Sequence, residues 1–235
     1  GGNAPPSVAN TEVWNGTSWF EVNDINTTRS RSGFSGNATD GLIFGGSTSP
    51  RQQTELWNGA VWAEQNDMSQ ARQYLSGAGT QPSAIAISGQ TSPGGALESA
   101  SEEWDADFGH GAWVTGPTLN LARAHNAGVG TKDSGLNIGG IDASPAEVAN
   151  TELYNGTAWG ELNDLNTARR FLAAGGTSTS AVAFGGNPSP RAINESWNGT
   201  SWTETGDLNT ARRILMGTGS SNTNALAFGG SPALD

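Results

Sequence analysis

Short apolar runs alternate with polar turns along the whole chain, and the pattern returns at intervals of 43 to 50 residues. One part of it is an apolar run closed by two glycines, as in residues 181–184 followed by Gly185-Gly186. Another is a Thr-Glu-apolar-aromatic segment followed by an Asn-Gly pair. Because both residues of an Asn-Gly turn tolerate positive φ, strand-like runs around it are typical of β-hairpins. The pattern predicts an all-β chain of many short strands.

Five copies of the Thr-Glu-x-aromatic segment set the register of the repeat. They begin at residues 11, 54, 101, 151 and 194, so that the spacings are 43, 47, 50 and 43 residues, as expected for four-stranded propeller blades. All nine Trp fall in two columns of this alignment. The first column contains Trp14, Trp57, Trp104 and Trp197, with Tyr154 in the fifth place. The second contains Trp19, Trp62, Trp113, Trp159 and Trp202.

Each unit is predicted to hold four strands, for example residues 170–174, residues 181–184, the Thr-Glu-x-aromatic strand and a short strand through the second Trp. The two ends of the chain are incomplete units: residues 11–22 supply only the last two strands, and residues 213–228 only the first two. Together they make one blade, which would close a ring and remove its open sheet edges. We therefore expect residues 1–235 to form a single β-propeller of about five blades. An open solenoid is the alternative, but its terminal units are usually polar caps, and neither end has this character.

The order of landmarks resembles the kelch motif over almost the whole chain: Arg, apolar strand with two glycines, Glu-x-aromatic strand, then Trp. Kelch propellers more often have six or seven blades than the five counted here. The amino-acid sequence of residues 11–19, 164–170 and 225–230 is also similar to kelch-like repeats in structural and fibre proteins of tailed phages, particularly marine ones. That resemblance implies a virion component or host-surface binder, located in the virion, outside the cell or at a cell surface.

Residues that recur in every unit have a structural and a functional interpretation. The repeated Glu stands in register with a repeated Arg, which favours a buried ion pair in each blade over a set of catalytic carboxylates. The first Trp column favours packing within and between blades. For the second column, packing and a row of sugar-stacking platforms remain comparable alternatives. The glutamates are Glu12, Glu55, Glu102, Glu152 and Glu195, and the arginines are Arg29, Arg72, Arg123, Arg169 and Arg212.

Function is expected where the units differ, and the third unit has an expanded acidic stretch, residues 90–112. An acidic loop of this kind could bind Ca²⁺ or present carboxylates to a sugar, although its spacing matches no EF-hand or zinc pattern and a solvated loop is the favoured interpretation. No other cofactor is expected. The candidate ligand-binding residues are Asp105, Asp107, His110, Trp113, Trp19, Trp62, Trp159 and Trp202.

Composition narrows the partners and the chemistry. A formal charge of -11 argues against nucleic acid, and no apolar run is long enough to cross a membrane as a helix. With no Cys, two His and two Tyr, a copper oxidase resembling galactose oxidase is excluded, and only Asp105 and Asp107 offer a non-repeated carboxylate pair for a glycosidase. Gly1-Gly2 looks like the tail of a repeat, as if the chain were cut from a longer protein.

The sequence thus predicts a non-enzymatic structural or adhesion module that contacts other subunits of an assembly, or a glycan or protein on a host surface. A lectin-like propeller is the alternative, and a glycosidase-type enzyme is less favoured.

Overall fold

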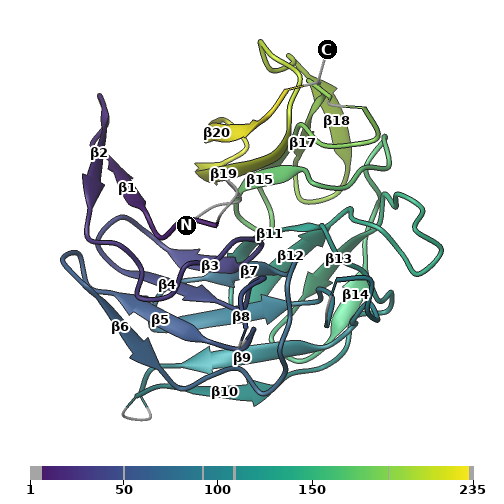
Figure 1. The fold of residues 1–235 in the computed structure, drawn as a ribbon. Coiled ribbons are helices and arrows are strands. Elements are labelled where there is room, and N and C mark those ends of the chain that lie inside the picture. Colours follow the sequence, from purple (N-terminus) through teal and green to yellow (C-terminus); the bar gives the residue numbers. More distant parts are fainter. Residues whose placement is uncertain (1–6, 50, 92, 108–109, 190, 233–235) are drawn as a thin grey trace.

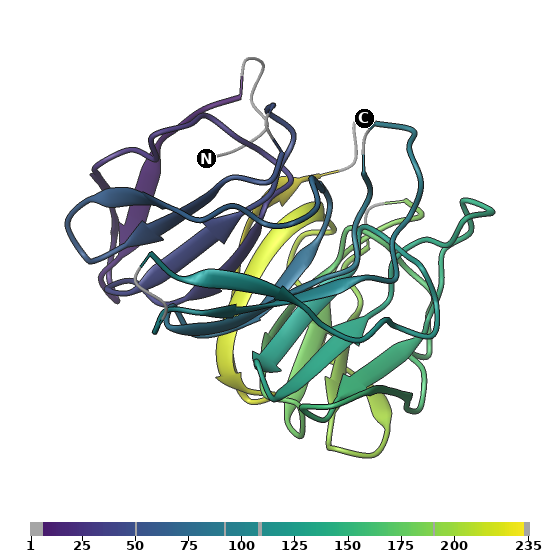
Figure 2. The ribbon, with the colours of Figure 1, turned by 90° about the horizontal axis from the view of Figure 1, so that it is seen from below.

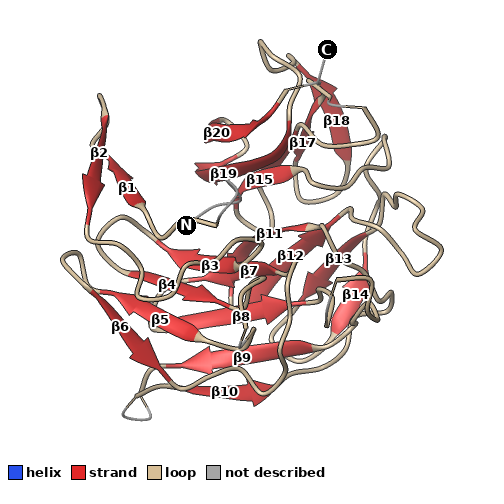
Figure 3. Ribbon diagram, in the orientation of Figure 1, coloured by secondary structure: helices blue, strands red, loops and turns tan. Residues whose placement is uncertain are grey.

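The computed structural model describes residues 7–232 except 50, 92, 108, 109 and 190. This part of the chain is built from strands and loops without a helix, as Figure 3 shows, so it contains no helix that is long and apolar enough to cross a membrane. Its strands form four antiparallel sheets of four strands and two antiparallel pairs. The prediction of an all-β chain is confirmed.

Each four-stranded sheet is a meander of consecutive strands, and each pair is a hairpin. The first two full sheets contain β3 (Gly33–Gly36), β4 (Gly41–Phe44), β5 (Thr54–Trp57) and β6 (Trp62–Gln65), then β7 (Ser76–Gly79), β8 (Ser83–Ile87), β9 (Ser101–Asp105) and β10 (Ala112–Thr115). The next two contain β11 (Ala127–Thr131), β12 (Ser134–Ile138), β13 (Thr151–Tyr154) and β14 (Trp159–Glu161), then β15 (Ala173–Gly176), β16 (Ala181–Phe184), β17 (Asn194–Trp197) and β18 (Trp202–Thr205). The pairs are β1 (Thr11–Trp14) with β2 (Trp19–Val22), and β19 (Arg213–Ser221) with β20 (Asn224–Ser231).

The sheets are arranged like the blades of a propeller, with the first strand of each blade nearest a common centre (Figure 1). Consecutive inner strands contact one another from β3 to β7, β11, β15 and β19. These strands are rich in glycine: a Cβ on Gly77 would lie 2.6 Å from the carbonyl oxygen of Phe34, and one on Gly128 would lie 2.8 Å from that of Gly77. Small residues are therefore required where the blades converge.

The two hairpins supply the strands that the sequence assigns to a shared fifth blade, but they are separate sheets in the structure. Figure 2 shows the yellow β19–β20 hairpin between the purple N-terminal strands and the green strands of the last full blade. The two hairpins touch through Trp19 and Phe228, whose ring centroids are 5.3 Å apart. The structure thus establishes a propeller-like arrangement without a closed fifth sheet.

A buried ion pair joins the start of each full blade to its third strand. The arginine lies just before the inner strand and the glutamate lies on the third strand, where it also accepts a backbone N–H from the interblade loop, as in Asn166 N to Glu195 Oε2 at 2.7 Å. Burial lowers the pKa of all four arginines, and the paired carboxylates oppose that shift. The pairs are Arg29 with Glu55, Arg72 with Glu102 at 2.7 Å, Arg123 with Glu152 at 2.9 Å and Arg169 with Glu195 at 3.0 Å. The predicted structural ion pair is confirmed in these four blades.

The glycine pairs connect each blade to the next. The second glycine donates its N–H to the carbonyl of the next blade's buried arginine, as in Gly46 N to Arg72 O at 2.9 Å. The first glycine approaches the same carbonyl so closely that a Cβ on Gly45 would lie 2.8 Å from Arg72 O, and Gly45 also has a φ of +67°. Both the close approach and the left-handed backbone require glycine here.

The two Trp columns pack as cross-strand partners at the outer end of each blade. In the full blades the first-column rings are buried, with Trp104 and Trp197 completely so. Trp113 and Trp202 of the second column reach back to the preceding blade, where their Nε1 atoms donate to Thr54 Oγ1 and Thr151 Oγ1 at 2.9 and 3.0 Å. In the full blades these rings therefore pack within and between blades.

One predicted boundary is wrong. The inner strand expected at residues 170–174 begins instead at Ala173, because the chain first crosses near the centre with Phe171 in a left-handed conformation, φ +54°. The strand expected at residues 181–184 is confirmed.

Replacement of Gly45 by alanine tests the interblade approach. We expect Gly45→Ala to lower the free energy of unfolding by about 2 kcal/mol or more, because a left-handed non-glycine residue alone costs about 1–2 kcal/mol and the new Cβ would press on the Arg72 carbonyl. Gly160→Ala is the control, since a Cβ there meets nothing within 4 Å. Urea titration measures both variants; equal stabilities would contradict this account of the glycine pairs.

Candidate functional site

One position of the repeat holds a different amino acid in each of the five units, although it lies close to the arginine that all five units share. It is the second residue after the buried arginine, and all five copies have left-handed backbone, with φ between 54° and 61°. The buried arginine and the glycine pair fix the chain on one side, and the inner strand begins on the other. The residues at this position are Arg31, Tyr74, His125, Phe171 and Ile214; we call them the axial residues.

Backbone hydrogen bonds join the axial residues in a chain around the centre. Tyr74 N donates to Arg31 O at 2.8 Å, and His125 N donates to Tyr74 O at 3.1 Å. The same bond recurs from Phe171 N to His125 O at 2.9 Å and from Ile214 N to Phe171 O at 3.0 Å. Each blade therefore places its axial side chain relative to the previous one, at the end of the inner strands where they begin.

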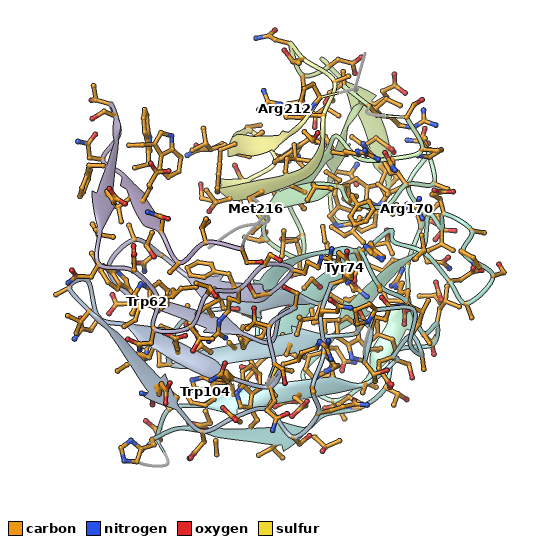
Figure 4. The ribbon with its side chains drawn as sticks, viewed as in Figure 1. Trp62, Tyr74, Trp104, Arg170, Arg212 and Met216 are labelled. Atoms are coloured by element: carbon orange, nitrogen blue, oxygen red, sulfur yellow. The ribbon has the colours of Figure 1, made fainter. Side chains whose placement is uncertain are left out.

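The axial side chains form an aromatic cluster flanked by two cations. The His125 ring contacts both of its neighbours, with centroids 3.9 Å from Tyr74 and 4.2 Å from Phe171, and those two rings also contact each other at 5.8 Å. The Arg31 guanidinium lies over the Tyr74 ring at 4.7 Å, and that of Arg170 lies over the Phe171 ring at 5.5 Å. Figure 4 shows Tyr74 and Arg170 near the centre of the molecule, whereas Trp62 and Trp104 lie farther out on the blades.

This environment keeps His125 uncharged. Burial, and then the positive charges of Arg170 and Arg31, lower the pKa of His125 to about 3. Its Nδ1 atom is buried and has no hydrogen-bond partner among the described residues. Burial also raises the pKa of Tyr74. At neutral pH the cluster therefore presents a neutral imidazole and a neutral phenol between two cations.

A cavity of about 110 Å³ opens beside the cluster. Its lining includes all five axial residues together with Asn126 and Met216, and none of the described residues that line it carries a carboxylate. Asn126 is held in place below by Ser76 Oγ, to which its amide donates at 2.8 Å. Within the described residues, no three His, Asp or Glu side chains gather to hold a metal ion. The site can therefore hold a small ligand by aromatic contact, positive charge and hydrogen bonds.

The acidic loop residues lie away from this cluster, at the outer end of the third unit. Asp105 ends β9 and its Oδ1 accepts the Asp107 N–H at 3.0 Å, as in an Asx turn. Asp107 and His110 are exposed. The structure does not bring these three side chains together with the axial residues, and their role in binding stays a prediction.

The second Trp column is divided by burial. Trp159 and Trp202 are 7% and 5% exposed, so their ring faces are covered by neighbouring residues. Trp62 and Trp113 are partly buried, and Trp113 packs edge-on against Phe44 at 5.0 Å. Trp19 is 42% exposed because it lies on the separate β1–β2 hairpin. A sugar-stacking role has room at Trp19 and little at Trp159 or Trp202.

Differences in loop length between the units do not point to the axial residues, because this position lies in a segment of constant length. Their signal was present in the alignment, as a column that reads Arg, Tyr, His, Phe and Ile two places after an invariant Arg. What the sequence alone did not reveal is that this column converges on one point.

Comparison with known proteins does not assign the chain to a family. No family model matches the chain, and no curated protein matches it.

The ionisation of His125 tests the geometry of the cluster. We expect its imidazole to stay neutral from pH 7 down to about pH 4, because its pKa is about 3. The unfolded chain takes up this proton near pH 6.5, so His125 should cost stability progressively as the pH falls from about 6.5 toward 3. Ring ¹⁵N shifts measure the titration, and His110→Asn leaves His125 as the single histidine to assign. A midpoint near 6.5 would contradict the buried position.

Proposed function

We propose that this chain is a non-enzymatic recognition module: a five-bladed ring within a larger assembly that contacts a host-surface glycan or protein through its axial cluster. One observation carries the proposal. Residues that are the same in every repeat are used in ion pairs, turns and packing, whereas the five axial residues differ and gather at one point. Asymmetry concentrated at the centre of a symmetric scaffold is suited to recognition of one partner.

The non-enzymatic part of the proposal rests on the chemistry of the axial cavity. Glycoside hydrolysis needs two carboxyl groups on either side of the bond to be broken. The described residues that line the cavity include none. Asp105 and Asp107, the candidate carboxylate pair of a glycosidase, lie in a turn at the outer end of a blade.

The setting we propose is a virion appendage or a cell surface. This setting is supported by the resemblance of the repeat sequence to kelch-like repeats of phage fibre proteins. The charge of -11 adds that an anionic backbone such as nucleic acid would be repelled by most of the surface.

A second candidate is a rigid spacer that packs against neighbouring subunits. Four buried ion pairs with near-identical partners, and backbone bonds at the four junctions from Arg72 to Arg212, favour a stiff scaffold that resists deformation. A spacer would need no particular side chains at the centre, so the two functions differ in what they require of Tyr74 and His125.

The proposal includes closure of the ring by the two terminal hairpins, with β1 beside β20. In this arrangement Glu12 would pair with Arg212, as the equivalent residues do in the four full blades. The fifth axial bond would run from Arg31 N to Ile214 O. Support comes from buried polar atoms left without partners among the described residues: Thr11 Oγ1 and Trp62 Nε1 are the counterparts of the bonded Thr54–Trp113 pair. Asn194 Oδ1 likewise lacks a donor and occupies the place that would receive Trp19.

Exposed apolar side chains also support closure. Of the nine large apolar side chains exposed among the described residues, seven lie on the strands beside the gap in Figure 1. Burying them against the missing partners would recover roughly 25 cal/mol for each Å² removed from water. The seven are Trp14, Trp19, Phe20, Phe34, Ile214, Met216 and Leu226.

Paired substitutions of Glu12 and Glu195 test closure. Glu195→Gln leaves Arg169 buried without its charge partner and should cost about 3–5 kcal/mol. In a closed ring Glu12→Gln should cost a similar amount, whereas in open hairpins it would cost little because Glu12 is exposed. Glu204→Gln, on the exposed face of β18, is the control.

Urea midpoints at several protein concentrations complete this test, since closure within one chain makes them independent of concentration. A Glu12→Gln variant as stable as the unsubstituted chain, beside a destabilised Glu195→Gln variant, would overturn the closed ring. Midpoints that rise with concentration would assign the closing strands to a second copy.

A glycan array, with and without Ca²⁺, tests recognition. We expect the chain to bind a limited set of glycans and Tyr74→Ala to lose that binding, while Val61→Ala, an exposed apolar position on a hairpin, retains it. Loss of binding on Asp105→Asn but not on Tyr74→Ala would move the site to the acidic loop. Silence across the array would favour the spacer.

A further inference from the structure

Arg31 and Arg170 keep hydrogen-bonding capacity that the protein itself does not use. The single side-chain bond of Arg31 in the described structure is from Nη1 to Gln73 Oε1, at a long 3.4 Å. Arg170 has its Nε 3.5 Å from Glu147 Oε1, and both side chains of this pair are more than a fifth exposed. By contrast, Arg169 makes four bonds and is completely buried. Arg31 and the neighbouring Arg170 are therefore available to a ligand.

The axial cavity is positively charged, whereas the molecule as a whole is negatively charged. The chain carries 22 acidic residues against 11 Lys and Arg, yet the described cavity lining has one arginine and no carboxylate. The positive charges of Arg31 and Arg170 both act on His125, and their guanidinium groups lie over the rings of its two neighbours, Tyr74 and Phe171. An anion is thus attracted to this point and to little else around it.

Backbone groups at the centre limit the kind of ligand. Four axial N–H groups and four axial carbonyls are already paired with one another. An extended peptide binds by adding a strand to free backbone edges, and in the closed ring proposed above the remaining pair, Arg31 N–H and Ile214 O, would also be joined and leave it none. What remains is side-chain chemistry: two guanidinium groups, the unpartnered His125 Nδ1, the Tyr74 hydroxyl and the faces and edges of three aromatic rings.

We propose that the axial site binds a carboxylate-bearing pyranose, such as a uronate or sialate residue at the end of a glycan. Arg31 holds the carboxylate, Arg170 adds positive potential from the rim, the aromatic cluster packs against the C–H face of the sugar, and neutral His125 exchanges a hydrogen bond with a hydroxyl. The inference rests on the recognition function and specifies its ligand. Cation and ring are both needed, because a guanidinium gives directed bonds to carboxylate and an aromatic face suits the apolar face of a pyranose.

The cavity size agrees with this division of roles. A volume of about 110 Å³ takes a carboxylate or a small substituent, and not a whole oligosaccharide. The rest of the sugar would lie over the rings of the aromatic cluster. Glu147 is the carboxylate that competes for Arg170, and its pair is exposed enough to exchange at little cost.

Calorimetric titration of the full chain with sodium D-glucuronate and with N-acetylneuraminate tests the proposal. We expect both to bind, D-glucose to bind at least tenfold more weakly, and Arg31→Gln to lower affinity for the acids about tenfold or more, which is the effect of losing one charge-assisted interaction. Arg170→Gln should cause a smaller loss that salt diminishes, and Glu147→Gln should leave affinity unchanged or raise it. Lys132→Gln is the charge-matched control, because Lys132 lies in the β11–β12 turn at the other end of the inner strands.

The alternatives give different results. Equal affinity for acetate and glucuronate would reduce the site to a carboxylate site without a sugar, and tighter binding of an acetylated dipeptide carboxylate would assign it to a protein terminus. Equal losses in Arg31→Gln and Lys132→Gln would reveal non-specific attraction. Tyr74-dependent binding of neutral glycans alone would overturn the acidic ligand and leave the recognition function standing, whereas an array without any Tyr74-dependent ligand would overturn both.

Discussion

The buried arginine at the start of each blade is the interaction on which the rest of the structure depends. Its guanidinium binds the glutamate of the third strand and two backbone carbonyls, as Arg72 does with Glu102, Ser88 O and Ala100 O. From Arg72 onward, its own carbonyl also accepts the N–H of the preceding blade's second glycine. One residue therefore fixes the inside of its blade and the distance to the previous one. Because an unpaired buried guanidinium would be costly, the arrangement enforces one geometry more than it adds net stability.

The axial residues owe their position to this arginine. Two residues beyond it, the chain adopts left-handed backbone in all five units, including bulky residues such as Tyr74 and Phe171 for which that conformation is unfavourable. Four of the five axial N–H groups donate to the preceding axial carbonyl, and these hydrogen bonds help to offset the strain. Strain retained five times at one place, in side chains that differ, is a feature to be expected where a scaffold serves recognition.

The repeat could be read from the sequence, because each of its landmarks has a local cause. Asn-Gly turns, Trp columns and the Arg–Glu correspondence predicted the strand order, the register and four ion pairs that the structure contains. The axial site could not be read in the same way, since convergence at a centre is a property of the whole arrangement of blades. Residues 31 and 171 are 140 positions apart, and no local pattern places their side chains around one histidine.

The acidic loop and the axial cluster differ in how strongly they indicate function. The loop stands out by its length, and the cluster by the convergence of side chains from several blades. An expanded loop such as residues 90–112 is conspicuous in an alignment, but an outer loop can vary in length without disturbing the blade that carries it. The axial column cannot change without changing the cavity that its residues line. Here the residues that are the same in every repeat stabilise the fold. A position that differs between repeats, but is held in place by such residues, is therefore the stronger indication of a binding site. That indication leads to His125, kept neutral between two arginines in a chain that is otherwise acidic.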